Sequence, residues 1–368
     1  VWKLGLYASM KVAEDATNSA SLALNDRADG LWAQAGAAAA YYEPEILALD
    51  PTTLDDYLSQ AEGLRPYRHY LDRLQRRREH VRSSEVEQVL AQAAEPMGAF
   101  YAVQTALADA DLKLGTIQDE DGNEVELGQA NYGIYLHHPN RQVRQAAWET
   151  SSDAYLAMKN TFAANYAGAV KRDVFLARAH RYDSSLEAAL SPNSIPLEVF
   201  HNLIDTVWKN LPTWQRYFKA RAKLLGVDKA RAWDISESPI QPAGAPPQRT
   251  ITYEQGVELI AQSLAPLGDE YVGFVRQGIA DQWVDWGVNA GKVGGAFSTG
   301  MPGQHPFILM SWHDDLGSVS TLTHELGHSL HSFYAWRTQP LIYADYSMFV
   351  AEVASNMNQA LMGAHLLE

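Results

Sequence analysis

The sequence contains no cysteine among its 368 residues. Disulfide bonds, thiolate nucleophiles and zinc sites built on cysteine are therefore excluded. Any metal site in this protein must be built from histidine, aspartate or glutamate. The lack of disulfides also fits the cytoplasm, which is the location that we expect.

Long apolar runs and a surplus of basic residues are also missing. No stretch approaches the roughly 18 to 20 uncharged residues that span a bilayer, and the first residues lack the pattern of a signal peptide. Acidic residues outnumber basic ones, 44 against 29, which gives a formal net charge of −15. We therefore expect neither a membrane nor nucleic acid as a partner, because phosphate binding needs a clustered basic face. The basic run at residues 68–80 is interrupted by Asp72 and Glu79, and we interpret it as a solvated helix face.

The dominant pattern of the sequence is helical. Apolar residues recur at three- and four-residue spacing and predict long helices over residues 16–49, 83–114, 140–180 and 196–226. Asp121-Gly122 predicts a β-hairpin turn, and the proline-rich stretch 236–248 is either an interdomain linker or a long surface loop. These patterns predict a mostly α protein with two lobes, residues 1–130 and residues 131–368. The chain starts at Val1 rather than methionine and finishes in a helical pattern without a stop signal, so we expect that it is truncated at both ends.

One short motif carries most of the chemical information: "LTHELGHSLHS", residues 322–332. Its helix is predicted to begin near Asp314 or Asp315 and to run until Pro340. At 100° per residue, His324 and His328 lie about 40° apart on one face, so both imidazoles can reach a single ion. Glu325 then lies beside the metal, where it can accept a proton from a water molecule. The motif is short, and false matches to it occur by chance.

A catalytic zinc needs a third protein ligand, and two acidic residues downstream are candidates. Glu352 lies in "SMFVAEVASNMNQALMG", where a carboxylate among apolar residues is costly to bury unless a metal compensates it. The alternative for Glu352 is an exposed position on a polar face. Asn356, one turn further on, is the candidate hydrogen-bond partner of a zinc-bound histidine. Asp345 is the other acidic candidate for the third ligand, and His331 is interpreted as a packed structural histidine.

A second non-helical region, residues 294–312, precedes the motif. Ala296, Phe297 and Ser298 form one short extended piece and residues 307–312 another, which predicts a hairpin in a small sheet beside the metal helix. An exposed strand edge there can bind an extended peptide by strand addition. The other interpretation is a hairpin that only closes the core.

Taken together, "GGAFS", "PFILMSW", "TLTHELGHSLHSFY" and "FVAEVAS" resemble, in this order and spacing, the oligoendopeptidase F branch of the thimet oligopeptidase family of zinc metallopeptidases. The resemblance implies zinc at His324, His328 and Glu352, with Glu325 as catalytic base. It also implies a two-lobed helical zinc-peptidase fold whose channel admits short unstructured peptides, with residues 131–368 as the catalytic domain. The long metzincin motif does not fit, because Tyr334 stands where its third histidine belongs.

The same resemblance implies that something follows the present sequence. Members of this family continue well beyond their metal glutamate, where a histidine and tyrosines contact the scissile carbonyl. We therefore expect a catalytic domain that is incomplete at its C-terminus. Two rival hypotheses remain: a catalytically silent peptide-binding protein or inactive fragment that retains the metal site, and another zinc hydrolase with Asp345 as its third ligand. The sequence leaves the oligomeric state open.

Overall fold

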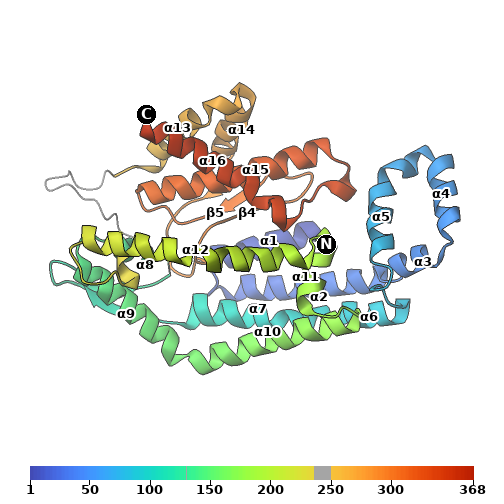
Figure 1. Cartoon of the computed structure of the whole chain (residues 1–368), viewed down its shortest axis with the longest axis horizontal. Coiled ribbons are helices and arrows are strands. Elements are labelled where there is room, and N and C mark those ends of the chain that lie inside the picture. Colours follow the sequence, from blue (N-terminus) through green and yellow to red (C-terminus); the bar gives the residue numbers. More distant parts are fainter. Residues whose placement is uncertain (130, 236–249) are drawn as a thin grey trace.

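Helices make up most of the computed structural model, which describes residues 1–129, 131–235 and 250–368 (Figure 1). The predicted mostly α fold with a small sheet beside the motif helix is confirmed. The proline-rich stretch 236–248 lies outside the described residues. Each helix in the described part of the chain is too short or too polar to cross a membrane.

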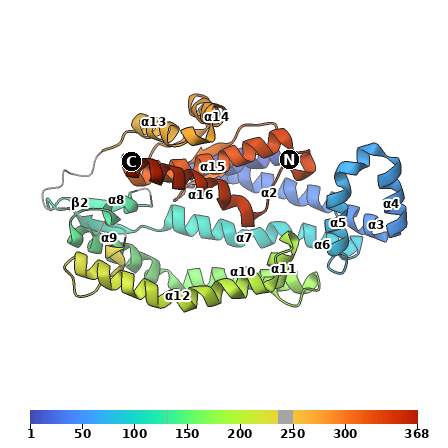
Figure 2. The same cartoon turned by 45° about the horizontal axis from the view of Figure 1, so that its top comes forward.

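The N-terminal half is a series of antiparallel helices. Figures 1 and 2 both place α7 (Ala94–Thr105) between α10 (Lys159–Ala179) on one side and the pair α15 (Leu316–Thr338) and α16 (Met348–Leu367) on the other. The predicted helix over residues 196–226 is one continuous helix, whereas the other three long helices are interrupted. Pro96 lies in the first turn of α7, where its missing N–H is tolerated, and it separates α7 from the helix before it. The elements are α1 (Trp2–Glu14), α2 (Ser19–Ala39), α3 (Tyr42–Ala48), α4 (Pro51–Gln60), a 3₁₀ segment (Glu62–Tyr67), α5 (Arg68–Arg76), α6 (Ser84–Gln92), α7 (Ala94–Thr105), a π-helical turn (Ala106–Asp111), α8 (Tyr132–Leu136), α9 (Arg141–Ala157), α10 (Lys159–Ala179), α11 (Ser185–Leu190) and α12 (Leu197–Leu224).

The predicted hairpin at Asp121-Gly122 is confirmed. Strand β1 (Gly115–Gln118) pairs antiparallel with β2 (Glu124–Leu127), and Gly122 has a φ of 82°, in the left-handed region that glycine adopts freely. The hairpin packs on α9 through a small core of Leu114, Ile117, Leu127, Val143 and Ala147. This core contains residues from both sides of position 130, which is the predicted boundary between the two lobes. The division into two lobes stays a prediction.

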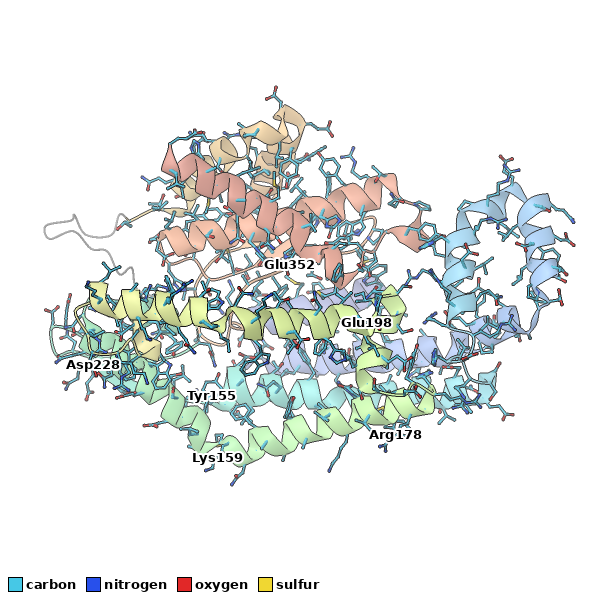
Figure 3. All side chains as sticks on the ribbon, in the orientation of Figure 1. Tyr155, Lys159, Arg178, Glu198, Asp228 and Glu352 are labelled. Carbon is cyan, nitrogen blue, oxygen red and sulfur yellow. The ribbon has the colours of Figure 1, made fainter. Side chains whose placement is uncertain are left out.

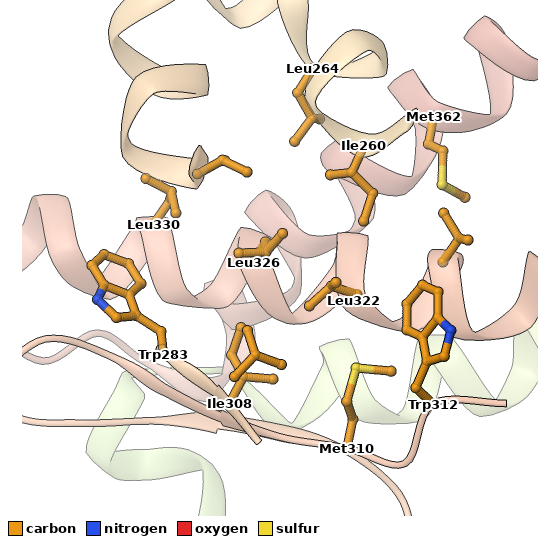
Figure 4. Packing of buried hydrophobic residues seen from close by; sticks show 13 residues of the cluster. Ile260, Leu264, Trp283, Ile308, Met310, Trp312, Leu322, Leu326, Leu330 and Met362 are labelled. Carbon is orange, nitrogen blue, oxygen red and sulfur yellow. The ribbon is translucent and has the colours of Figure 1, made fainter. Parts of the chain in front are cut away.

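The C-terminal part surrounds one hydrophobic core (Figure 4). A three-stranded sheet has the order β3-β5-β4, with β5 parallel to β3 and antiparallel to β4. The predicted hairpin is β4 and β5, although only residues 307–309 of the expected second piece form a strand. The third strand, β3, was not predicted. The elements are α13 (Tyr253–Ser263), α14 (Asp269–Ala280), β3 (Val284–Asp285), β4 (Phe297–Thr299), β5 (Phe307–Leu309), α15 (Leu316–Thr338), a 3₁₀ turn (Leu341–Tyr343) and α16 (Met348–Leu367).

Helix α15 forms the centre of this core. The side chains of Val319, Leu322, Leu326 and Leu330 are buried on one face of the helix, against the sheet and α13 (Figure 4). Asp315 caps the helix by accepting a hydrogen bond from the N–H of Ser318, as predicted for one of the two aspartates. The buried face fixes the rotation of α15, so the histidines of the motif must project from another face.

A buried carboxylate joins α9 to the end of α12. Asp234 is fully buried and accepts two hydrogen bonds of 2.8 Å from the Arg141 guanidinium. The buried Arg144 lies 3.6 Å from the same carboxylate, and Arg221 of α12 donates to the Asp234 carbonyl at 2.7 Å. Burial alone raises the pKa of Asp234, but the hydrogen bonds from Arg141 and the Arg231 N–H, with the charges of Arg141 and Arg144, lower it overall.

Replacing Asp234 by asparagine is therefore expected to lower the free energy of unfolding at pH 7 by about 3 kcal/mol, since it leaves buried arginine charge uncompensated. A folded-state pKa below the unfolded value stabilises the protein above the unfolded pKa, and this stabilisation is lost as the pH falls through the folded pKa. The difference between the two proteins should thus shrink below about pH 4. Urea unfolding at both pH values measures it, with the exposed Asp205→Asn as control. A constant difference at all pH values would contradict the assigned charge pairing.

Candidate metal centre and catalytic base

Two helices supply the site, and they cross at very close range. Gly327 of α15 faces Ser355 of α16, and a Cβ on Gly327 would lie 2.5 Å from the Ser355 Cα. Glycine is therefore required at this crossing, because any other side chain would push the helices apart. The close approach brings the histidine face of α15 to the first half of α16, where Glu352 is located (Figure 3).

Three potential ligand atoms converge there. The Nε2 atoms of His324 and His328 are 3.1 Å apart, and Glu352 Oε2 lies 3.2 Å from the first and 3.4 Å from the second. Within the described residues these three side chains are the group that could hold a metal ion, with all ligand atoms within 4.8 Å of one another. Two imidazole nitrogens and one carboxylate oxygen match the donors that zinc accepts, with a further position left for water.

Hydrogen bonds outside this group orient its members. His324 Nδ1 lies 2.9 Å from Gln359 Oε1, and because this amide oxygen only accepts, the ring donates from Nδ1 and leaves a lone pair on Nε2. Gln359 is held in turn by its donation to Ser320 Oγ. Ser355 Oγ donates to Glu352 Oε2 at 2.8 Å. His324 is thus arranged to present an unprotonated Nε2 to a cation.

The prediction for Asn356 is not what the structure shows. Asn356 is exposed, and Gln359 is the hydrogen-bond partner of His324. The reason is the antiparallel course of the helices: His324 precedes His328 on α15 and therefore meets a later part of α16. Gln359 is seven residues after Glu352, about 20° away around the helix, and this spacing could have indicated it.

Glu325 lies beside the group but does not join it. Its carboxylate is buried, and its Oε2 has no hydrogen-bond partner in the described part of the chain. Burial raises the pKa of Glu325 to about 7; His324 and the backbone N–H of Ser298 act to lower it, and Glu352 acts to raise it. This carboxylate is buried, its pKa is near neutral, and one of its oxygens is free to form a hydrogen bond. It is therefore suited to accept a proton from a bound molecule.

The edge of the sheet faces this carboxylate. The N–H groups of Ile308 and Met310 in and after β5 donate to carbonyls at β3, at 2.7 and 3.0 Å. Because backbone groups alternate along a strand, Phe307 and Leu309 face β4, and the N–H and C=O of Ser298 face away from the sheet. The Ser298 side chain is fixed to α15 through a 2.8 Å hydrogen bond with the buried Ser329. Within the described residues no further strand pairs with this edge of β4, which lies next to Glu325.

The remaining sequence candidates lie outside the group. Ala296 precedes strand β4, which begins at Phe297. The imidazole of His331 stacks on Tyr346 with a centroid distance of 3.7 Å, as expected of a packed histidine. Asp345 accepts a hydrogen bond from the Tyr346 N–H and is not part of the ligand group. The structure therefore brings Glu352, and not Asp345, to the two histidines.

Comparison with known proteins identifies the family of this chain. The model of a family described as "Peptidase family M3" matches residues 134–368, which is more than half of the chain. The chain belongs to this family. A second model, described as "Oligopeptidase F", matches residues 45–113.

Individual relatives in this family extend beyond the matched region. Oligopeptidase PepF of Bacillus subtilis is 41% identical over 99% of this chain and 54% of its own length. Group B oligopeptidase PepB of Streptococcus agalactiae is 34% identical over the whole chain and 60% of its own length. The crystal structure of oligoendopeptidase-F from Enterococcus faecium superposes with a TM-score of 0.71 at 30% identity, over 99% of this chain and 58% of that one. The chain thus spans a little more than half the length of the relatives that it matches.

Proposed function

We propose that this chain carries the catalytic centre of a zinc-dependent endopeptidase that hydrolyses internal bonds of short unstructured peptides. The observation that carries the proposal is the convergence of His324, His328 and Glu352 at one point, with the buried carboxylate of Glu325 beside them. Family membership supports hydrolysis of peptides. The cytoplasm is proposed as the location.

The residues present fit a zinc ion. His324 Nε2, His328 Nε2 and Glu352 Oε2 are the atoms that would hold it, since the Gln359 contact leaves the Nε2 lone pair of His324 free. A bound zinc ion supplies a Lewis acid that polarises a peptide carbonyl and lowers the pKa of a water molecule.

The chain's own residues then have distinct roles. Glu325 accepts a proton on its free Oε2 as water attacks the scissile carbonyl, and the same carboxyl group gives this proton to the leaving nitrogen. The backbone of Ser298 pairs with an extended peptide at the edge of the sheet, with Phe297 and Ala296 beside it. No covalent intermediate is needed, because water is the nucleophile.

Cleavage of a short internally quenched peptide by the purified 368-residue chain tests this function. The expected result is chelator-sensitive hydrolysis that zinc restores, with products that show cleavage of an internal bond. Zinc binding without hydrolysis would favour the alternative of a silent peptide-binding protein or an inactive fragment. Cleavage only at the peptide termini would overturn the endopeptidase assignment.

Removal of the Gln359 amide gives a more local prediction. Gln359→Ala is expected to weaken zinc binding by about 10-fold, because the outer hydrogen bond fixes the tautomer and orientation of His324. Asn356→Ala is the matched control on the same helix, and its zinc affinity should equal that of the unchanged chain. Competition with a chromophoric chelator measures both. Equal losses in the two variants would contradict the assigned role of Gln359.

A further inference from the structure

The connection between the two metal helices, residues 339–347, carries two tyrosines with different partners. Tyr343 contacts α5 in the N-terminal half, and Tyr346 contacts α15 one turn beyond His328. Figure 1 shows this connection at the end of the α15–α16 pair that approaches α5. The segment is therefore attached on both sides before the chain enters α16.

Tyr346 attaches the end of the connection to α15. Its ring lies parallel to the imidazole of His331, with 3.7 Å between centroids and an interplanar angle of 8°. Its hydroxyl forms a 2.8 Å hydrogen bond with Ser332 Oγ. Burial raises the pKa of Tyr346, against the Ser332 hydrogen bond, and the carboxylates of Asp345 and Glu352 raise it further. The ring and the hydroxyl of Tyr346 are thus both fixed to α15.

Tyr343 attaches the other side of the connection to the N-terminal helices. Its hydroxyl donates to the Pro66 carbonyl at 2.6 Å and accepts from the N–H of Tyr70 at 3.0 Å. The Tyr70 N–H belongs to the first turn of α5, where N–H groups lack partners within the helix, and the N-cap residue Tyr67 provides no side-chain bond. A residue more than 270 positions away in sequence therefore caps α5.

Capping and apolar burial give the start of α16 little support. Its N-cap Ser347 makes no side-chain cap, and Met348, Phe349 and Val353 are 79%, 65% and 66% exposed. The Glu352 side chain is itself 54% exposed, and the hydrogen bond from Ser355 belongs to the same helix. Burial of apolar side chains therefore does little to fix the first two turns of α16, which are positioned by the helix crossing at Gly327 and Ser355 on one side and by the connection on the other.

We propose that Tyr346 and Tyr343 are positioning residues for Glu352. Tyr346 holds the start of α16 on α15, so that the carboxylate meets the histidine pair. Tyr343 extends this support to α5, so that the N-terminal helices contribute to metal affinity without contacting the metal. This inference rests on the proposed function, in which Glu352 is a zinc ligand.

Zinc dissociation constants of variants of the 368-residue chain test the proposal. Tyr346→Leu removes the stack and the hydrogen bond and should weaken zinc binding by about 10-fold, the scale of outer-shell losses. Tyr343→Phe should weaken it by about threefold, the scale of a lost hydrogen bond. Tyr334→Phe is the matched control, since this hydroxyl is on α15 but lies away from the connection, 3.5 Å from Glu270, and its affinity should not change.

The stack itself can be tested by rescue. His331→Phe keeps an aromatic partner for Tyr346 and removes a buried ring nitrogen that has no hydrogen bond to any described residue, so zinc affinity should be retained. His331→Ala removes the partner and should resemble Tyr346→Leu. Equal affinity in both His331 variants would overturn the role of the stack.

Failure of the inference is distinguishable from failure of the metal site. If Glu352→Ala leaves zinc affinity unchanged, the proposed ligand set is wrong and the inference falls with it. If Glu352→Ala weakens zinc binding while Tyr346→Leu lowers only the thermal midpoint of the zinc-free protein, the tyrosine is structural and the inference is overturned. Should Tyr346→Leu fail to fold, Tyr346→Phe removes only the Ser332 bond and must still weaken zinc binding, by about threefold.

Discussion

Replacing Glu325 by glutamine is expected to leave zinc binding intact and to lower the rate of peptide hydrolysis by about 1000-fold, within the range of general acid–base catalysis. Glutamine keeps the size of the side chain and removes its ability to accept a proton. The carboxylate is adjacent to the ligand group but is not one of its members, so the metal site should remain complete. Steady-state kinetics with a quenched peptide and zinc content by mass spectrometry measure the two effects.

Glu254→Gln is the control for this experiment, because Glu254 is an exposed residue on α13. Its hydrolysis rate and zinc content should match those of the unchanged chain. A Glu325→Gln variant that loses zinc would make Glu325 a ligand, and one that retains full turnover would remove it from the proton-transfer step. Either result would contradict the proposed mechanism.

Replacing Glu352 by alanine is expected to weaken zinc binding by more than the roughly 10- to 100-fold that outer-shell changes cost. The variant leaves two histidines as ligands, which is one fewer than catalytic zinc sites use. Loss of the carboxylate also leaves the two Nε2 atoms without a negative group between them. Hydrolysis should fall together with the zinc content.

Asp345→Ala is the matched control, since Asp345 is the rival third ligand and lies in the connection before α16. It should retain zinc affinity within about twofold, less than the effect of losing even an outer hydrogen bond. The rival zinc-hydrolase hypothesis predicts the reverse, with zinc lost on changing Asp345 and retained on changing Glu352. That outcome would remove Glu352 from the metal site.

The motif helix was predictable because several local signals agree. The capping aspartate, the spacing of His324 and His328, and the proline after the helix all act within one element, and the structure has α15 at Leu316–Thr338. The apolar positions of the same helix also follow its period, and they fill the core in Figure 4. A helix can be predicted from its sequence where helix propensity, capping residues and the pattern of buried positions all favour the same structure.

The burial predicted for Glu352 was wrong, even though the residue lies beside the histidines. The sequence placed it among buried apolar neighbours, whose burial would make an uncompensated carboxylate costly. In the structure Phe349 and Val353 are exposed, and so is about half of Glu352. Apolar composition indicates which face can be buried, but it does not show whether another element covers that face.

The other features that the sequence did not predict depend on contacts between elements that are distant in sequence. The choice between Asn356 and Gln359 depends on the offset between two crossing helices, which Gly327 and Ser355 fix and which no periodicity reveals. Strand β3 has two residues and is defined by its pairing with β5, so its sequence carries little signal. Tyr343 and Pro66 meet only after folding, from opposite ends of the chain.

The most direct measurement of the central claim is an anomalous difference map, recorded at the zinc absorption edge, from crystals of the zinc-loaded chain. We expect one peak bound by His324 Nε2, His328 Nε2 and a Glu352 oxygen, at about 2.0 to 2.2 Å, with Glu325 close by and unbound. A zinc peak elsewhere in the chain, or one bound by Asp345 in place of Glu352, would contradict it.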